Sequence, residues 1–421
     1  MARSSRVLFL SALQIHPTIS GGTLRSFGLA TALRRHGFDV CVHSLTGRKA
    51  DYKARRPSSV QFWPDGTPEH VDRDVPSAIA WLGGFVAGLP PVWISAQLAA
   101  TATSPGEMLL PSALREKLKW CDTIVADFPF VSPIFLAPSA SGKRRVLSTH
   151  NVEHHLLDGQ DAWRSRLTRA VVRKIEMRAA DACDILVSCC ADDGRFFETN
   201  GQRRHAVVVP NGVDLRRFSG IESLRADARR ELGVSDSAKL FLFTASKWGP
   251  NREAFEYLHA FAGSHQQLLV EQGIHIAVVG NVVAQPVRRP GFTATGRVER
   301  LEPYFAAADA AINPIESGAG TNVKMGEFIA ARLPMLTTPF GSRGLTIEHG
   351  KTGFLFERDG LAPVLSTVRR LFDEDPARLR RMALEAYAQN ESVVDMDLCV
   401  QRLVDALGCR EAIPFTETSP A

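Results

Sequence analysis

The sequence predicts an α/β protein built from two doubly wound parallel sheets. Residues 6–44 run as strand, glycine loop, helix and strand, the opening unit of a parallel sheet. A second such series begins at residue 239, after the turn Pro210-Asn211-Gly212. The length of 421 residues exceeds what one hydrophobic core organises, so we expect two domains of ordinary size.

Composition and charge restrict the class of protein. Hydrophobic residues make up 45% of the chain and charged residues 23%, as in soluble globular proteins, and the net charge of +5 predicts no nucleic-acid partner. The N-terminal apolar run has only the length of a strand, which argues against a signal peptide, and glycines and prolines interrupt the longest apolar stretch, 78–92. The 7 cysteines lack the spacing of metal ligands, so we expect reduced thiols in a cytoplasmic protein.

A basic helix is expected at residues 164–178. It has six basic residues against Glu176, with apolar residues at helical spacing. Two interpretations stay open: the helix lies on an anionic membrane surface at the inner membrane face, or it is a solvated face over a core stripe.

The first half of the chain contains two groups of candidate residues. Gly21-Gly22 precedes a helix but lacks dinucleotide-binding spacing, and a tight turn explains it equally well. Strands at 122–130 and 144–149 are followed by the second group, which lies where parallel sheets bind ligands; this group comprises His150, Asn151, Glu153, His154 and His155. A three-histidine metal site is a weaker alternative, because no acid or cysteine recurs at helical spacing. We expect an irregular loop at 49–74 and a core helix in the apolar segment 79–95.

The second half has its strongest signal between residues 314 and 345. A strand ends at Asn313, and Gly318, Gly320 and Thr321 open a helix, whose free N–H groups and positive dipole end favour a phosphate. Lys324 adds a cation and Glu327 a carboxylate one turn on, which suggests a nucleotide-sugar site. The alternative is an ordinary strand, loop and helix with a solvated Lys-Glu pair.

Two motifs, VVPNGVD and GAGTNVKMGEF, resemble those of the retaining family 4 glycosyltransferases. This resemblance covers nearly the whole chain and implies the GT-B fold, two Rossmann-like domains facing each other across a cleft. It implies an acceptor domain at 1–204, a nucleotide-sugar donor domain at 205–392, and at 393–421 a helix that returns to the first domain, with a tail from 414.

The resemblance also implies roles for single residues. His150 would bind the donor sugar, with His154 and His155 as competitors for that role. Lys324 would neutralise the diphosphate charge and Glu327 would bind the ribose, and His150, Lys324 and Glu327 are the predicted catalytic residues. The implied donor-binding residues are Gly21, Gly22, Gly212, Lys247, Asn251, Arg252, Gly296, Arg297, Val298, Gly318, Ala319, Gly320, Thr321 and Asn322. Ala319 stands where the usual family motif has a second glutamate, a departure that leaves the sugar undefined. For Gly296-Arg297-Val298 a surface turn is an alternative.

The implied activity is transfer of a monosaccharide from a nucleotide diphosphate sugar, UDP- or GDP-linked, to a glycan, lipid-linked or small-molecule acceptor in cell-surface polysaccharide or glycoconjugate synthesis. We expect no cofactor and no metal, because no pair of aspartates separated by one residue marks a divalent-cation loop. The alternatives are a nucleotide-sugar epimerase of the same fold and a non-catalytic nucleotide-sugar-binding subunit.

Overall fold

The chain divides into two compact units. The computed structural model describes residues 5–18, 21–45, 58–72, 110–157, 163–201, 206–318 and 322–408. Unit 1 comprises Met1–Pro210 and Val400–Ala421, and unit 2 comprises Asn211–Cys399. The predicted apolar helix at 79–95, the loop residues 319–321 and the tail from 414 lie outside the described residues.

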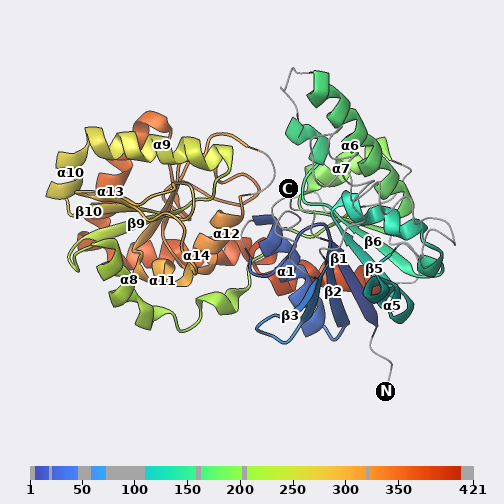
Figure 1. Ribbon diagram of the computed structural model, residues 1–421. Coiled ribbons are helices and arrows are strands. Elements are labelled where there is room, and N and C mark those ends of the chain that lie inside the picture. The colour runs from blue at the N-terminus through green and yellow to red at the C-terminus, as the bar shows by residue number, and fades with distance from the viewer. Residues whose placement is uncertain are drawn as a thin grey trace. The chain divides into compact units, whose positions relative to one another are not determined.

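Unit 1 is organised around an eight-stranded sheet with the order β3-β4-β2-β1-β5-β6-β7-β8 (Figure 1), parallel except for β3 against β4. The central strands β1 and β5 are buried on both faces, which explains why each is a largely apolar run. The strands are β1 (Arg6–Ser11), β2 (Asp39–Leu45), β3 (Ser59–Phe62), β4 (Pro68–Asp72), β5 (Thr123–Asp127), β6 (Arg144–Ser148), β7 (Ile185–Ser188) and β8 (Ala206–Val208). The helices are α1 (Gly21–Arg35), α5 (Ser112–Trp120), α6 (Trp163–Ala182) and α7 (Ala191–Asn200), with 3-10 turns η2 (Pro129–Leu136), η3 (Pro138–Ala140) and η4 (Glu153–Leu157).

The expected irregular loop at 49–74 is wrong for its second half, where β3 and β4 form an antiparallel pair. A buried carboxylate, rather than a run of apolar residues, holds this pair. Glu69 accepts hydrogen bonds from the backbone N–H of Ile15 at 2.7 Å, from the Ser44 hydroxyl at 2.6 Å and from the Trp63 indole at 2.8 Å. Ile15 and Ser44 are remote from Glu69 in sequence, so the pattern of residues 59–72 alone did not predict the two strands.

Helix α6 has the predicted amphipathic character. Its described basic residues Arg166, Arg169, Arg173, Lys174 and Arg178 are exposed, while Val172 and Glu176 are buried. Membrane contact through the basic face stays a prediction. Within the described residues, no helix combines the length and apolarity that crossing a membrane requires.

Unit 2 contains a seven-stranded sheet with the order β11-β12-β10-β9-β13-β14-β15, in which only β11 runs antiparallel to its neighbour. Helices α9, α10 and α13 cover one face, and α8, α11, α12 and α14 cover the other (Figure 1). The strands are β9 (Lys239–Thr244), β10 (Ile274–Val279), β11 (Val287–Arg289), β12 (Phe292–Ala294), β13 (Ala310–Asn313), β14 (Met335–Thr337) and β15 (Phe354–Leu355). The helices are α8 (Arg225–Leu232), α9 (Gly249–Ser264), α10 (Gln266–Glu271), α11 (Glu302–Ala307), α12 (Val323–Ala330), α13 (Leu361–Glu374), α14 (Pro376–Val394) and α15 (Met396–Gly408), with 3-10 turns η5 (Leu215–Phe218), η6 (Glu222–Leu224) and η7 (Arg358–Gly360).

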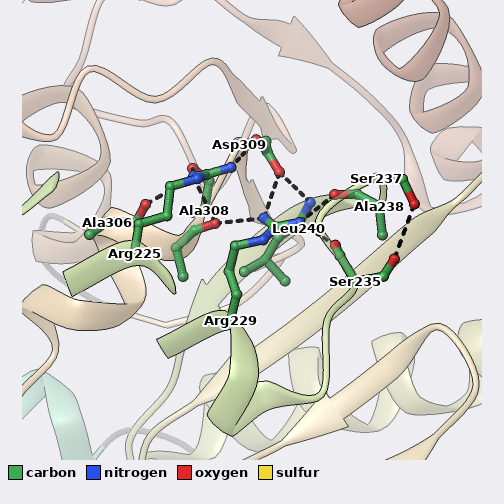
Figure 2. Close-up of polar contacts among 10 residues, drawn as sticks. Arg225, Arg229, Ser235, Ser237, Ala238, Leu240, Ala306, Ala308 and Asp309 are labelled. Atoms are coloured by element: carbon green, nitrogen blue, oxygen red, sulfur yellow. Dashed lines mark hydrogen bonds and ion pairs between the residues drawn. The ribbon is translucent and has the colours of Figure 1, made fainter. Parts of the chain in front are cut away.

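A buried charge network joins α8 to the starts of β9 and β13. The side chains of Arg225 and Arg229 both point toward Asp309 (Figure 2), with nitrogen to oxygen distances of 2.7 and 3.1 Å. Asp309 also accepts the backbone N–H of Leu240 at 2.8 Å, and Arg229 donates to the carbonyls of Ser235 and Ala238. Each buried polar group therefore has a partner, as burial of charge requires.

The end of the chain contains the last strand of unit 2 and the final helix. The segment GKTGFLFERDG at 350–360 predicts a hairpin-like return, but the structure has a turn followed by β15, which pairs parallel to β14. The final helix α15 begins in unit 2, and from Val400 onward it belongs to unit 1.

Candidate active site

In unit 2, two of the segments that contain predicted donor residues lie at the switch point of the sheet. Strands β9 and β13 are neighbours, and the connections from them lead to opposite edges. Loops that follow such a pair of strands meet at the carboxyl ends of the sheet, where α/β proteins bind ligands. In unit 2 these two loops are residues 245–248, before α9, and residues 314–318, before α12.

Helix α12 follows the predicted glycine loop. Its N-cap is Asn322 and its first residue is Val323. No described residue accepts a hydrogen bond from the Asn322 side-chain nitrogen, although that atom is buried. Because Ala319, Gly320 and Thr321 lie outside the described residues, their assignment to the diphosphate stays a prediction.

Lys324 links the first turn of α12 to the first turn of α9. Its ammonium donates to the Asn251 side-chain oxygen and lies 4.6 Å from the centroid of the Phe243 ring. Asn251 in turn donates to the Ser246 hydroxyl at 2.9 Å. Burial lowers the pKa of Lys324 to about 7, against the opposing attraction of Glu327. The structure therefore places a desolvated amine where the sequence predicted a diphosphate cation.

Gly318 fits closely against the other loop. Its φ of 115° lies in the region that favours glycine, and a Cβ there would lie 2.5 Å from Trp248 Cη2 and 3.1 Å from Pro250 Cγ. A larger residue would push the loops apart.

The sequence missed the partner of Glu327. This carboxylate is 3% exposed, and Arg217 Nη1 donates to its Oε1 at 2.9 Å. Arg217 Nε donates to Glu302 at 2.9 Å, so one guanidinium joins two carboxylates. Burial alone would raise the pKa of Glu302, but the charge of Arg217 brings it below its ordinary value. Arg217 lies three residues after Asp214, which caps η5 by accepting a hydrogen bond from the Arg216 backbone N–H.

The other predicted donor residues of unit 2 are more dispersed. The Arg252 side chain is 72% exposed and its nearest carboxylate oxygen, on Glu256, is 3.9 Å away. Lys247 is exposed, and its backbone N–H donates to Asn281 at 3.1 Å. Close packing explains why a glycine occupies position 212, because a Cβ there would lie 2.6 Å from Met396 Cα.

The loop at 296–298 follows strand β12. Gly296 is buried with a φ of 75°, while Arg297 is exposed and Val298 packs against the core between the sheet and α11. The positive φ explains why a glycine occupies position 296. The contact of this loop with a nucleobase stays a prediction.

In unit 1, the corresponding switch point lies between β1 and β5. At their carboxyl ends the Ser11 hydroxyl donates to Asp127, and the Ser26 hydroxyl donates to the same oxygen at 2.6 Å. His150 Nε2 lies 2.8 Å from the other Asp127 oxygen. Asp127 was not among the predicted site residues, although it lies within the strand predicted at 122–130 and is the last residue of β5.

The His150 ring is held on both sides. It stacks on Phe128 with centroids 3.8 Å apart, and Phe128 has a φ of 78°. A Cβ on Gly22 would lie 3.5 Å from His150 Nδ1, so the start of α1 approaches that nitrogen closely. Gly21 and Gly22 are the first residues of α1 rather than a loop before it. Since Asp127 contacts Nε2, the ring is oriented with Nδ1 toward the helix start.

The three histidines do not form a metal site together. His154 Nδ1 lies 2.6 Å from Glu176, which also accepts the backbone N–H of Glu153 at 2.6 Å. His150 is bound to Asp127 instead. Burial raises the pKa of both Glu153 and Glu176 to about 7.

Comparison with known proteins defines the class to which this fold and these sites belong. Residues 19–217 match the family described as Glycosyltransferase Family 4, and residues 238–374 match the one described as Glycosyl transferases group 1. The two matches share no residue. The two units are the two α/β domains of a GT-B glycosyltransferase. The chain belongs to the family 4 glycosyltransferases.

Solved structures support the same fold at low sequence identity. Sucrose-phosphate synthase from Thermosynechococcus elongatus has a TM-score of 0.65 and 17% identity, over 96% of this chain and 99% of that one. Anabaena HepE in complex with UDP and glucose has a TM-score of 0.63 and 16% identity over the same shares. The catalytic domain of starch synthase IV from Arabidopsis thaliana, bound to ADP and acarbose, has a TM-score of 0.59 and 14% identity, over 96% of this chain and 98% of that one. No curated protein matches the chain.

Proposed function

We propose that the protein transfers a monosaccharide from a nucleotide diphosphate sugar to an acceptor hydroxyl, with retention of configuration and without a metal ion or cofactor in the transfer step. The observation that carries this proposal is the group at the β9/β13 switch point. There the amine of Lys324, the buried amide of Asn322 and the carboxylate of Glu327 lie on one short helix.

The chemistry of the donor matches these groups. A diphosphate gains negative charge as it leaves, and Lys324 with the N–H groups at the start of α12 would stabilise that charge. Glu327 Oε1 is bound by Arg217, and within the described chain its Oε2 has no hydrogen-bond partner, so that oxygen suits a ribose hydroxyl. Structures of HepE with UDP and with UDP-glucose favour a UDP-sugar as the first donor to test.

Retention would follow a front-face mechanism. The bond from the anomeric carbon to the diphosphate breaks, the acceptor oxygen bonds to the same face, and its proton passes to the leaving phosphate. His150, oriented by Asp127, would bind the transferred sugar. A covalent glycosyl-enzyme trapped on any carboxylate would contradict this mechanism.

The test separates donor binding from transfer. Lys324→Ala and Glu327→Ala should each weaken UDP binding by roughly 1.5–3 kcal/mol in titration calorimetry, because each removes one charge-assisted contact. His150→Ala should lower turnover with little change in UDP affinity, and His154→Ala is its matched control.

The outcomes distinguish the rival functions. Unchanged affinity in both unit 2 variants would mean that the nucleotide binds elsewhere. Conversion of the donor without acceptor would indicate an epimerase. Binding without transfer or hydrolysis in the purified single chain would indicate a non-catalytic subunit.

A further inference from the structure

A cluster of two thiols and a carboxylate lies at the carboxyl edge of the unit 1 sheet, outside the residues assigned to the sugar donor. Cys189 and Cys190 follow β7, and Asp193 lies in the first turn of α7. The two sulfurs and one Asp193 oxygen all lie within 4.8 Å of one another. Cys189 Sγ is 3.5 Å from Asp193 Oδ2.

From this geometry we infer a metal site: Cys189, Cys190 and Asp193 bind one thiophilic divalent cation, of which Zn²⁺ is the natural example. Zn²⁺ takes thiolate sulfur at about 2.3 Å and carboxylate oxygen at about 2.0–2.2 Å. Ligand atoms around a tetrahedral ion are therefore roughly 3.5–3.8 Å apart. The separation of Cys189 Sγ from Asp193 Oδ2 is already in this range.

The charges of the cluster favour a cation. Asp193 supplies a carboxylate whose side-chain hydrogen-bond partners are the two thiols rather than a lysine or arginine. Binding of the ion releases two thiol protons. The site changes from one carboxylate with two neutral thiols to one carboxylate, two thiolates and a dication, so its net charge is the same before and after. Metal binding thus adds no charge to a partly buried position.

The cluster is connected to His150. Cys189 Sγ donates to the His150 backbone carbonyl at 3.0 Å. A metal-bound thiolate has no proton to donate, so the ion would remove a support of the loop that contains His150. This link rests on the proposed function, whereas the binding of the ion does not. The inferred site departs from the sequence expectation, because adjacent cysteines lack the usual ligand spacing and Asp193 completes the set only in the folded helix.

The binding test uses Zn²⁺ alone with the full-length, reduced protein. Calorimetry in buffers of different ionisation enthalpy should show one ion bound and about two protons released. X-ray absorption at the zinc edge should show two sulfur neighbours at about 2.3 Å and lighter neighbours at about 2.0–2.2 Å. A coordination shell of nitrogen and oxygen alone would overturn the inference.

Two variants and one control identify the ligands. Cys190→Ser and Asp193→Asn should each weaken Zn²⁺ binding by at least about 10-fold, the loss that even outer-shell changes cause. Cys41→Ser, which alters a partly buried thiol on β2, should bind like the wild type. Circular dichroism checks that each variant is folded, and affinity equal to the wild type in both folded variants would overturn the inference.

The link to His150 is tested separately. Saturating Zn²⁺ should slow sugar transfer in the wild type and not in Cys190→Ser. Absence of transfer in every sample would contradict the proposed function and leave the binding result standing. Equal inhibition of both proteins would overturn the link.

Discussion

Arg217 is the single residue on which the arrangement of Glu327 depends most directly. Replacement by methionine removes the charge shared by Glu302 and Glu327 while keeping an unbranched side chain. We expect Arg217→Met to lower the free energy of unfolding by roughly 1.5–3 kcal/mol, since bonds to charged groups are lost. We also expect weaker UDP binding, because the two carboxylates are left facing each other. Urea denaturation and titration calorimetry measure the two effects.

The neighbouring Arg216 supplies the control. Its side chain is 58% exposed and pairs with Asp214 at 2.7 Å, and exposed ion pairs contribute little. Arg216→Met should therefore change stability by less than about 1 kcal/mol. Equal UDP affinity in the two variants would show that Arg217 does not position Glu327.

Lys324 should make donor binding depend on pH. Burial holds its pKa at about 7, so the amine loses its proton as the pH rises through that value. An anionic diphosphate favours the protonated amine, and above pH 7 binding must take up a proton. UDP affinity should therefore fall between pH 7 and pH 9. Lys324→Met should bind UDP weakly at both pH values, and an equal decline in this variant would assign the dependence to another group.

The same residues show what the sequence could reveal at this scale. Lys324, Glu327 and His150 could be singled out because each lies in a short motif, although their assigned roles stay predictions. Arg217 and Asp127 could not, because their partners are remote: Arg217 and Glu327 are 110 positions apart, and Asp127 and His150 are 23 apart. Such contacts depend on which strands become neighbours.

At the scale of elements, α6 is tied to the turn η4 through Glu176, and the titration of Glu153 should reveal this contact. Burial and the charge of Glu176 raise the pKa of Glu153 to about 7. The folded protein therefore keeps a proton that the unfolded chain loses near its ordinary pKa of 4.5. Stability from this group is present at pH 4.5 and is lost as the pH rises through 7.

Glu153→Gln cannot ionise and tests this dependence. We compare the free energy of unfolding of the variant with that of the wild type at each pH. This difference should favour the variant by roughly 1–3 kcal/mol more at pH 8 than at pH 5. Denaturant unfolding at the two pH values measures the difference. Glu116 lies on the exposed face of α5 and supplies the control. The free energy of unfolding of Glu116→Gln should differ from that of the wild type by the same amount at pH 5 and at pH 8. If Glu153→Gln behaves like Glu116→Gln, the carboxyl group is not desolvated.

Elements with a strong apolar period were predictable and those held by polar contacts were not. The buried strands β1, β5, β9 and β10 were predicted because they are apolar on both faces. The pair β3 and β4 was missed because Glu69 holds it through the backbone N–H of Ile15 and the hydroxyl of Ser44, which are remote in sequence, and through the Trp63 indole. The helix after the glycine loop was predicted, although glycine spacing alone does not identify Asn322 as its cap.

At the scale of the whole molecule, the last helix is the element that contributes residues to both units. Helix α15 leaves unit 2 at Cys399, and its second half belongs to unit 1. There Arg402 donates to the carbonyl that ends β8 at 3.2 Å, and Arg144 of β6 donates to the carbonyl of Leu407. An apolar stripe in the sequence predicted a packed helix, but a stripe alone does not state which unit it covers.

Leu403 tests this assignment. The residue is 2% exposed, so Leu403→Ala should lower the free energy of unfolding by roughly 2–5 kcal/mol through lost burial and a cavity. Hydrogen exchange should show weaker protection in β6 and β8 of unit 1, with β9 and β10 of unit 2 unchanged. Leu398 lies on the same helix with 45% exposure, so Leu398→Ala is the matched control and should have little effect. Loss of protection in β9 and β10 alone would mean that the second half of α15 stabilises unit 2 instead.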